Sequence, residues 1–371
     1  MKSAAFVISR QSLRPTGETP WVRALVRATR EVSSDPDTVF LCSLGGAPYE
    51  LALTLLADCG ASLQLWLSET QLSEYGGSVQ EARQHAVRQY GLSDSQLVGV
   101  HRASSKTGST QAELQERDMT ILNRADTLYP VSIRPNGFMN RALDEHSSIA
   151  ARVNDRYRVR YAKGPASIAR DYQSREINQK SAAALSDHLL HWTRTANGPW
   201  PGEVRGAYYR DIINSGPAYV RCAKSTLRRI ISEARLRGSS RHAPGKASVV
   251  AFTSSRLFES VRRMRYRARY REMTCEPYGI AIPREVAQRI GVQRISYRTT
   301  GELRGLSPKQ RLYAHSSGEN HNWEIEHEWR ALGDIDLAPL GGEITLLVDR
   351  QSEAEEMERE LGVNSLAVFA G

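Results

Sequence analysis

Three glutamates late in the chain have the residue type and the spacing for chemistry. Glu324, Glu326 and Glu328 are separated by single residues, and Trp329 and Arg330 follow. Period-two spacing is typical of a strand, here over 326–332, so we expect the three carboxylates to share one face. Like charges this close repel each other, and proteins keep such a group where a cleft uses a carboxylate. The alternative is a structural strand, with Trp329 in the core and Arg330 in a buried ion pair.

A histidine near the middle of the chain is a second candidate. His191 and Thr193 follow the apolar pair Leu189-Leu190, and a strand would place both side chains on one face. A neutral imidazole there can hydrogen-bond a ribose or an amide, and the threonine adds an acceptor. The alternative is a packed structural histidine. His188 and His191 lack further ligands at metal-binding spacing, so we expect no metal site.

Segment 256–271 combines positive charge with aromatic rings, and we interpret it as a helix. Such a helix could follow the backbone of a polynucleotide, DNA or RNA. The alternative is a solvated basic helix with half-buried tyrosines. The residues concerned are Arg256, Arg262, Arg263, Arg265, Tyr266, Arg267, Arg269, Tyr270 and Arg271.

Length and charge bound the class of protein. The chain has 371 residues, which favours two domains, and a net charge of +9. Residues 1–150 hold 14 of the 50 Lys and Arg and 16 of the 41 Asp and Glu, so the basic excess lies in the second part and indicates a polyanionic partner. We see no apolar span long enough for a membrane helix. Four scattered cysteines favour a reducing cytoplasm without disulfides or structural zinc.

The first part of the chain alternates strand-like and helix-like runs. This alternation predicts an α/β, Rossmann-like parallel sheet covered on both faces, over residues 1–148. The expected strands are 4–8, 38–43, 62–67, 96–100 and 127–133, and the expected helices are 20–32, 48–57, 79–90, 114–125 and one beginning at 137.

Three loops of this half should meet where ligands bind in such sheets, at the carboxyl ends of the strands. Glycines let a backbone approach a phosphate, and the following helix offers free N–H groups. The alternative is plain tight turns. The candidate nucleotide-binding residues are Ser9, Arg10, Ser43, Gly45, Gly46, Arg134, Asn136 and Gly137.

The rest of the chain has a different character. Residues 149–182 are polar and read as a linker. Residues 183–371 mix short strands with helices, which predicts an α+β domain with a mixed sheet. The expected elements include helices 222–235 and 283–290 and strands 247–253, 278–282 and 343–348.

The order of features in residues 1–145 resembles SLOG and DNA-processing-protein-A Rossmann-like domains. The matching pieces are Ser9-Arg10, Ser43-Leu44-Gly45-Gly46, and Arg117-Asp118 with Arg124-Ala125-Asp126 and Asn136-Gly137. The resemblance implies binding of a nucleotide or a nucleotide-derived ligand.

Residues 185–350 resemble two families. His191-x-Thr193, then Phe252-Thr253-Ser254-Ser255, then Glu326-x-Glu328 is similar to the order in ADP-ribosyltransferases, particularly DarT-type enzymes that modify DNA. Trp323-x-x-Glu326-x-Glu328-Trp329-Arg330 resembles the hallmark of proteins associated with abortive infection. The resemblance implies an NAD-consuming effector of antiviral or toxin type.

The resemblance also implies roles. Glu328 would stabilise the positive charge that develops on the NAD ribose, Glu326 would orient the acceptor or assist as a base, and His191 would hold the ribose. Tyr266 or Tyr278 would stack on the nicotinamide, Arg271 or Arg330 would pair with the pyrophosphate, and Thr193 is a further implied NAD contact. Two alternatives stay open: a non-catalytic nucleotide- or nucleic-acid-binding protein, and a nucleotide hydrolase or glycosidase that uses the first half.

Overall fold

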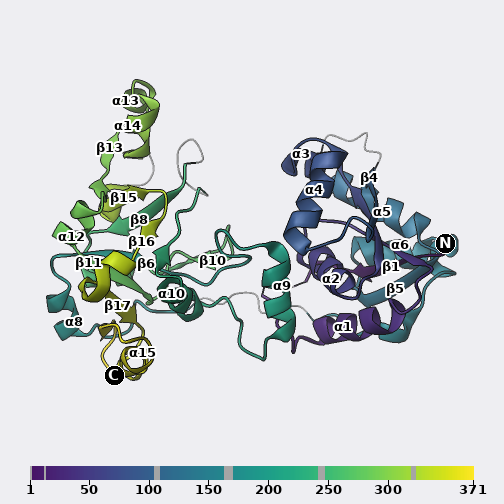
Figure 1. The fold of residues 1–371 in the computed structure, drawn as a ribbon, viewed down its shortest axis with the longest axis horizontal. Coiled ribbons are helices and arrows are strands. Elements are labelled where there is room, and N and C mark those ends of the chain that lie inside the picture. The colour runs from purple at the N-terminus through teal and green to yellow at the C-terminus, as the bar shows by residue number, and fades with distance from the viewer. Residues whose placement is uncertain (1, 12–13, 104–108, 163–169, 241–246, 319–322) are drawn as a thin grey trace. The chain divides into compact units, whose positions relative to one another are not determined.

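The chain forms two compact units in a computed structural model (Figure 1). The structure describes residues 2–11, 14–103, 109–162, 170–240, 247–318 and 323–371. Unit 1 comprises Met1–Ala166 and Glu203–Val220, and unit 2 comprises Ser167–Gly202 and Arg221–Gly371. Over the described ranges, we find no helix with the length and apolar character that a membrane crossing requires.

Unit 1 is built on a five-stranded, all-parallel sheet with the order β4-β3-β2-β1-β5. This confirms the predicted Rossmann-like α/β architecture. Parallel strands covered on both faces are apolar along their length, and every residue of β2 is buried. The strands are β1 (Lys2–Ile8), β2 (Thr38–Cys42), β3 (Ser62–Leu67), β4 (Leu97–Arg102) and β5 (Thr127–Ser132).

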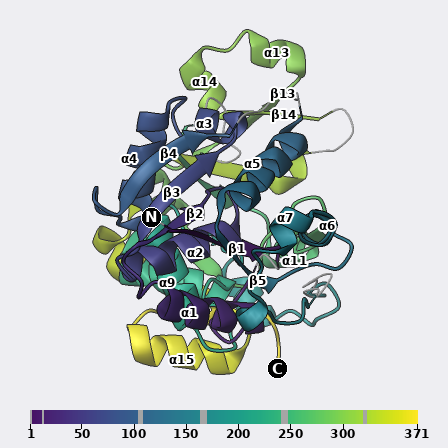
Figure 2. The same cartoon turned by 90° about the vertical axis from the view of Figure 1, so that its right-hand side faces the viewer.

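Helices cover both faces of this sheet (Figure 2). Phe6 and Ile8 of β1 face one helical layer, and Ala5 and Val7 face the other, as the period of a strand requires. The first layer holds α1 (Pro20–Val32), α2 (Ala47–Asp58) and α4 (Val79–Tyr90), and the second holds α5 (Thr110–Arg124), α6 (Phe138–Glu145) and α7 (Ser147–Ala150). A short α3 (Glu69–Glu74) precedes α4.

One helix of unit 1 comes from the second half of the sequence. α9 (Arg205–Asn214) packs on α2 and α4, and Tyr208 and Tyr209 join the core beneath α1 and α2. Gly206 lies so close to α4 that a side chain there would press on the backbone of Gln89 and Tyr90. Segment 203–220, which sequence analysis assigned to the second domain, therefore completes the first unit.

The segment interpreted as a linker is built partly into each unit. η1 (Asp155–Tyr157) buries Tyr157 in unit 1, and the Val159 N–H donates to the Val131 carbonyl at 2.8 Å, which covers the outer edge of β5. Further along, Tyr172 and Ile177 join a core of unit 2 before α8 (Gln179–Ala184).

Unit 2 contains a seven-stranded mixed sheet with the order β12-β15-β8-β6-β11-β17-β18. Neighbours are antiparallel except β17 and β18, which confirms the predicted α+β class. The strands are β6 (His188–Trp192), β8 (Val249–Thr253), β11 (Gly279–Pro283), β12 (Gln293–Arg294), β15 (Glu328–Leu332), β17 (Thr345–Val348) and β18 (Ser365–Ala367). A small pair, β7 (Arg235–Leu236) and β16 (Ile335–Asp336), and η4 (Ala338–Glu343) flank it.

The two faces of this sheet bury different cores. Phe252 and Trp329 lie on what we call the α10 face, packed with α10 (Ala223–Ser232), α12 (Arg284–Arg289) and α15 (Gln351–Leu361). Leu190 and Leu347 lie on the α11 face, packed with α11 (Leu257–Arg262). Side chains of β6, β8 and β15 can therefore be assigned to one face or the other.

The prediction of one helix over 256–271 is wrong. α11 ends at Arg262, and β9 (Tyr266–Arg267) and β10 (Glu272–Met273) form a hairpin. Glu272 is 2% exposed and pairs with Arg267 and Arg194, each at 3.2 Å, so a buried charge fixes the hairpin. Arg271 adopts a left-handed φ of 53° in the turn, a conformation that a continuous helix excludes.

The prediction that the three glutamates share one strand face is wrong, although the strand expected over 326–332 is present from Glu328 onward. Trp323–Glu326 form the short helix η3, His327 has a φ of +44°, and β15 begins only at Glu328. Glu324 and Glu326 therefore do not share a strand face with Glu328. The left-handed residue turns the chain between the two elements.

Between β12 and β15 the chain makes an excursion, residues 296–316, that we call the arm. It consists of β13 (Ser296–Arg298), α13 (Thr300–Arg304), α14 (Pro308–Leu312) and β14 (Ala314–Ser316). β13 and β14 pair in parallel. Neither helix has a buried residue, so the arm lacks a core of its own.

Candidate functional site

The three loops predicted to bind a nucleotide meet at one edge of unit 1. β2, β1 and β5 are neighbours, so the loops at their carboxyl ends are neighbours too. Successive strands progress from β1 to β4 in one direction, and β5 then lies on the other side of β1. Open α/β sheets bind their ligands at such a reversal of strand order.

At this reversal, Ser9 ties β1 to the loop after β5. Ser9 Oγ accepts a hydrogen bond from the Arg134 N–H at 2.9 Å, and the Ser9 N–H donates to the Ser132 carbonyl at 3.0 Å. Gln11 Nε2 donates to the carbonyls of Ser9 and Ser132 at 3.0 and 3.2 Å. Ser9 thus has internal partners, whereas Arg10 and Arg134 are exposed.

Asn136 and Gly137 form the turn into α6. Asn136 is left-handed, with a φ of 57°, and its carbonyl accepts a hydrogen bond from Arg141 at 2.9 Å. A side chain on Gly137 would come within 3.0 Å of the Arg134 carbonyl. The geometry of the turn therefore accounts for the residue types at both predicted positions.

The Gly-Gly loop before α2 is held by an ion pair whose carboxylate is buried. The Gly45 N–H donates to Glu50 at 3.0 Å, and Glu50 is fully buried. Arg205 of α9 donates to both Glu50 oxygens, at 2.6 and 3.0 Å. Ser43 is buried and donates to the Trp66 carbonyl at 2.8 Å, whereas a side chain added at Gly46 would meet nothing within 4 Å.

A second set of contacts holds the Leu44 carbonyl of the same loop. Arg117 donates to it at 3.3 Å, and Gln71 donates to it as well. Arg117 also pairs with Asp118 at 2.6 Å, and the Tyr49 hydroxyl donates to Asp118 at 2.8 Å. Burial raises the pKa of Tyr49, so the phenol keeps the proton that it donates.

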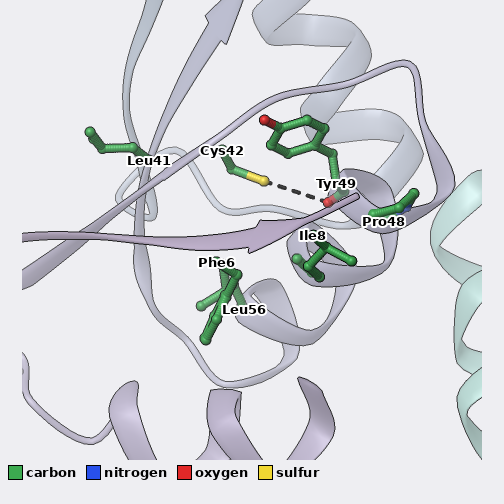
Figure 3. A pocket seen from close by; sticks show the side chains of 8 residues that line it. Phe6, Ile8, Leu41, Cys42, Pro48, Tyr49 and Leu56 are labelled. Carbon is green, nitrogen blue, oxygen red and sulfur yellow. Dashed lines mark hydrogen bonds between the residues drawn. The ribbon is translucent and has the colours of Figure 1, made fainter. Parts of the chain in front are cut away.

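Beneath this loop lies a cavity of about 10 Å³ between β1, β2 and α2 (Figure 3). Phe6, Ile8 and Leu56 line it, and Cys42 donates to the Tyr49 carbonyl at 3.5 Å. Burial raises the pKa of Cys42 to about 12. The space suits one water molecule and no nucleotide ring, so a ligand of this edge would lie outside the loop.

In unit 2, residues far apart in sequence meet on the adjacent strands β6, β8 and β15. Thr253 pairs with Leu190 on one side and with Glu328 on the other. Directly paired residues point to the same side of a sheet, so all three lie on the α11 face. The spacing of strands places the main chains of Leu190 and Glu328 about 10 Å apart.

Glu328 is oriented by Arg330, two residues along the same strand. Arg330 donates to the two carboxylate oxygens at 2.6 and 3.0 Å and to the Leu312 carbonyl at 3.0 Å. Arg330 is 4% exposed, and Trp329 lies in the core. Trp329 thus lies in the core and Arg330 in a buried ion pair, as the structural alternative expected, and the partner of Arg330 is the candidate carboxylate Glu328.

Glu326 lies in the turn that leads into β15, and this turn is fastened to the end of β8. Thr253 Oγ1 donates to the Glu326 carbonyl at 2.6 Å. Arg263, which follows α11, donates to the carbonyl of Ile325. Main-chain contacts thus fix the turn while the side chain of Glu326 stays part-exposed.

His191 lies on the opposite face of the sheet from Glu328. It pairs with Ile280, and its ring meets Phe252 edge-on at 5.6 Å, both on the α10 face. Its Nδ1 is 2.8 Å from the Ala251 carbonyl, which can only accept, so Nδ1 carries a proton. Burial lowers the pKa of His191, which keeps the imidazole neutral at pH 7.

Other contacts place the remaining predicted NAD ligands. The buried Thr193 hydroxyl lies 3.0 Å from the Tyr278 carbonyl. Tyr278 is 8% exposed and its hydroxyl donates to Glu353 at 3.1 Å. Tyr266 packs beside the α11-face core, and Arg271 lies exposed in the hairpin turn.

Sequence reasoning missed two aromatic residues beside Glu328 and gave no role to a third. Tyr297 on β13 accepts a hydrogen bond from the Glu328 N–H at 3.1 Å. His315 on β14 and Trp323 of η3 continue the same group of rings. The sequence before the glutamates carries aromatic residues that do not follow the apolar period of a helix or a strand. This pattern was the signal that could have identified them.

Comparison of the chain with family models, with curated proteins and with solved structures gives no match.

Proposed function

We propose that unit 2 breaks the nicotinamide–ribose bond of NAD and transfers ADP-ribose to an acceptor or to water, with Glu328 as the reacting carboxylate. One observation supports this most. The order β6-β8-β15 brings the His-x-Thr strand, the Thr253–Ser255 segment and the glutamate strand side by side, although they are separated by 60 or more positions in sequence.

The chemistry follows from a fixed carboxylate. Nicotinamide leaves as a neutral molecule with the bonding electron pair, and positive charge develops on the ribose carbon and ring oxygen. A preorganised negative group beside that carbon stabilises the transition state more than the bound substrate. An acceptor O–H or N–H, or water, then bonds to the carbon and releases a proton, which Glu326 accepts in this proposal.

Arg330 has a positioning role in this scheme. Its two charge-assisted hydrogen bonds hold the Glu328 carboxylate in one orientation. A carboxylate oxygen that accepts one hydrogen bond still has a lone pair for a ribose hydroxyl. His191 faces the other side of the sheet, so the proposal gives it no contact with the reacting ribose.

The test is incubation of the pure protein with NAD labelled in the adenine ring, alone and with DNA, RNA or lysate. We expect nicotinamide release or label transfer in the wild type and its loss in Glu328→Gln. Glu324→Gln is the matched control, because Glu324 is an exposed glutamate of the same turn. No NAD consumption under any of these conditions would reject the proposal.

A second candidate, polynucleotide binding, is favoured by the surface around the β9–β10 hairpin. Arg265, Arg269 and Arg271 are exposed there and form no ion pair within the described ranges. Tyr270 is 40% exposed, and the guanidinium carbon of Arg269 lies 5.7 Å from the centroid of its ring. Arginine charge beside exposed rings suits the phosphates and bases of a single strand.

For unit 1 we propose binding of a phosphate-bearing, nucleotide-type ligand at the reversal of strand order. Its position, the exposed Arg10 and Arg134, and the open backbone at Gly46 support this. Calorimetric titration with a panel of nucleotides tests it. Arg134→Ala should weaken binding, and Arg88→Ala, which removes an exposed arginine of α4, should not.

A further inference from the structure

Three rings gather where the arm meets the turn before Glu328. The ring centroids of Tyr297 and His315 are 6.4 Å apart at an angle of 62°, and those of His315 and Trp323 are 5.4 Å apart at 59°. All three side chains are part-exposed. We call them the aromatic cluster.

The backbone fixes the aromatic cluster from two sides. Tyr297 and His315 are direct partners in the β13–β14 ladder, so their side chains leave the same face. The Ser317 N–H donates to the Arg298 carbonyl at 2.8 Å, and the Trp323 N–H donates to the Ser317 carbonyl at 3.4 Å. The rings are therefore held in place before any ligand arrives.

The aromatic cluster is joined directly to the candidate catalytic strand. The Glu328 N–H donates to the Tyr297 hydroxyl at 3.1 Å. The hydroxyl is held as an acceptor, and its own proton has no acceptor within the described ranges. Burial and the neighbouring Glu328 and Glu326 raise the pKa of Tyr297, so this proton stays available for donation.

Core packing does not account for these rings. The helices of the arm bury no residue, and none of the three side chains belongs to a buried core. Tyr278 and Tyr266, which sequence analysis assigned to stacking, are placed by other contacts. The aromatic cluster provides the half-exposed aromatic surface beside Glu328 that was expected from Tyr266 and Tyr278.

We propose that Tyr297, His315 and Trp323 form the subsite that takes the planar nitrogen-containing ring of a ligand bound at Glu328. Aromatic side chains bind such rings by stacking and edge contacts, and the Tyr297 hydroxyl adds one hydrogen bond. The ring is the nicotinamide of NAD or the base of a nucleotide. The inference rests on the proposed function for the location of the site.

Trp323 makes the test direct, because a ring stacked beside it changes its fluorescence. The background is Glu328→Gln, which we expect to bind ligand without turning it over. The probes are nicotinamide, NAD and AMP, titrated into this variant and into the same variant carrying Trp323→Phe, Tyr297→Phe or His315→Ala. Phe258→Ala is the control, since it removes an exposed ring of unit 2 outside the aromatic cluster.

We expect saturable quenching that disappears with Trp323→Phe. Tyr297→Phe and His315→Ala should weaken binding by roughly fivefold to tenfold, the loss typical of one ring or hydroxyl contact. Quenching by nicotinamide identifies that ring as the occupant, and quenching by AMP identifies a nucleobase. NAD consumption by the wild type, together with either no quenching of Trp323 or unchanged affinity in both Tyr297→Phe and His315→Ala, would overturn the inference and leave the proposed function standing. Ring binding without NAD consumption would support the inference and reject the proposed function.

Discussion

The two units hold their candidate residues in different ways. In unit 1, Ser43, Gly45 and Glu50 lie at the edge where ligands of such sheets bind, yet each is hydrogen-bonded inside the protein. In unit 2, Glu328 is fixed by Arg330 and borders the half-exposed aromatic cluster. The difference teaches that position in a fold and availability for chemistry are separate properties. We expect changes at these internally bonded residues of unit 1 to act on stability and changes at Glu328 to act on activity.

The largest expected effect separates the two glutamates. Glu328→Gln should lower NAD turnover by about 100- to 1,000-fold, the size of one lost transition-state contact, because the amide keeps shape but removes charge. Glu50→Gln should leave turnover per folded molecule unchanged. Nicotinamide release, normalised to the folded fraction from circular dichroism, checks both. Equal losses in the two variants would abolish the contrast between the units.

The next effect concerns two ion pairs on one helix. Arg205→Ala leaves the buried Glu50 carboxylate unpaired, and we expect a loss of about 2–3 kcal/mol, at or below the lower end for buried pairs because Arg205 is 37% exposed. Arg210→Ala removes a pair with Asp58 in which both side chains are about 40% exposed, so it should cost about 1 kcal/mol or less.

Urea unfolding of both variants, followed by the signal of unit 1, measures this difference. If the two substitutions lower the free energy of unfolding by the same amount, burial of Glu50 does not control the stability of the Gly-Gly loop.

A smaller effect should appear on acidification. Burial lowers the folded-state pKa of His191 below the unfolded value near 6.5. Below that pH the unfolded chain binds a proton that the folded chain resists, so unit 2 loses stability as pH falls from about 6.5 toward the lowered folded pKa. His191→Gln should flatten this slope, because it removes the group whose pKa burial lowers. Melting temperatures between pH 7 and pH 5 report the slopes, and an unchanged slope in His191→Gln contradicts the prediction.

The smallest effect concerns the basic hairpin of unit 2. If Arg269 contacts a phosphate, Arg269→Ala should reduce the salt slope of single-strand binding by about 0.7. Arg30→Ala, which removes an exposed arginine of unit 1, should leave the slope unchanged. Fluorescence anisotropy with a labelled oligonucleotide at several salt concentrations provides the slopes. A similar change in both variants would indicate attraction by total charge alone.

Unit 1 was predictable because its elements are long and its sheet is buried on both faces. The apolar runs of the strands and the period of helix 20–32 agree with the structure to within a few residues. α9 was not assignable from sequence, because the surface that buries Tyr208 and Tyr209 lies more than a hundred positions earlier. A local sequence pattern does not show which distant part of the chain a residue will pack against.

In unit 2, local pattern was misleading at the site itself. The alternation around Glu326 suggests a strand, but the left-handed His327 ends the turn and sets the start of β15. The charge pattern of 256–271 suggests a helix, but the buried Glu272 pairs with Arg267 across the hairpin and with Arg194, which follows β6. In both places a tertiary contact outweighs the period of the sequence.

The position of α9 in the chain has a consequence for synthesis on the ribosome. Residues 203–220 emerge only after 167–202, the first segment of unit 2, so unit 1 cannot close its core when its own first 166 residues are complete. Domains usually fold in the order in which they are made. Here β6 of unit 2 is already exposed to the solvent, without its sheet, while unit 1 still awaits the helix that pairs with Glu50. A nascent chain arrested near residue 200 should therefore expose the apolar surface of α2 and α4 to chaperones.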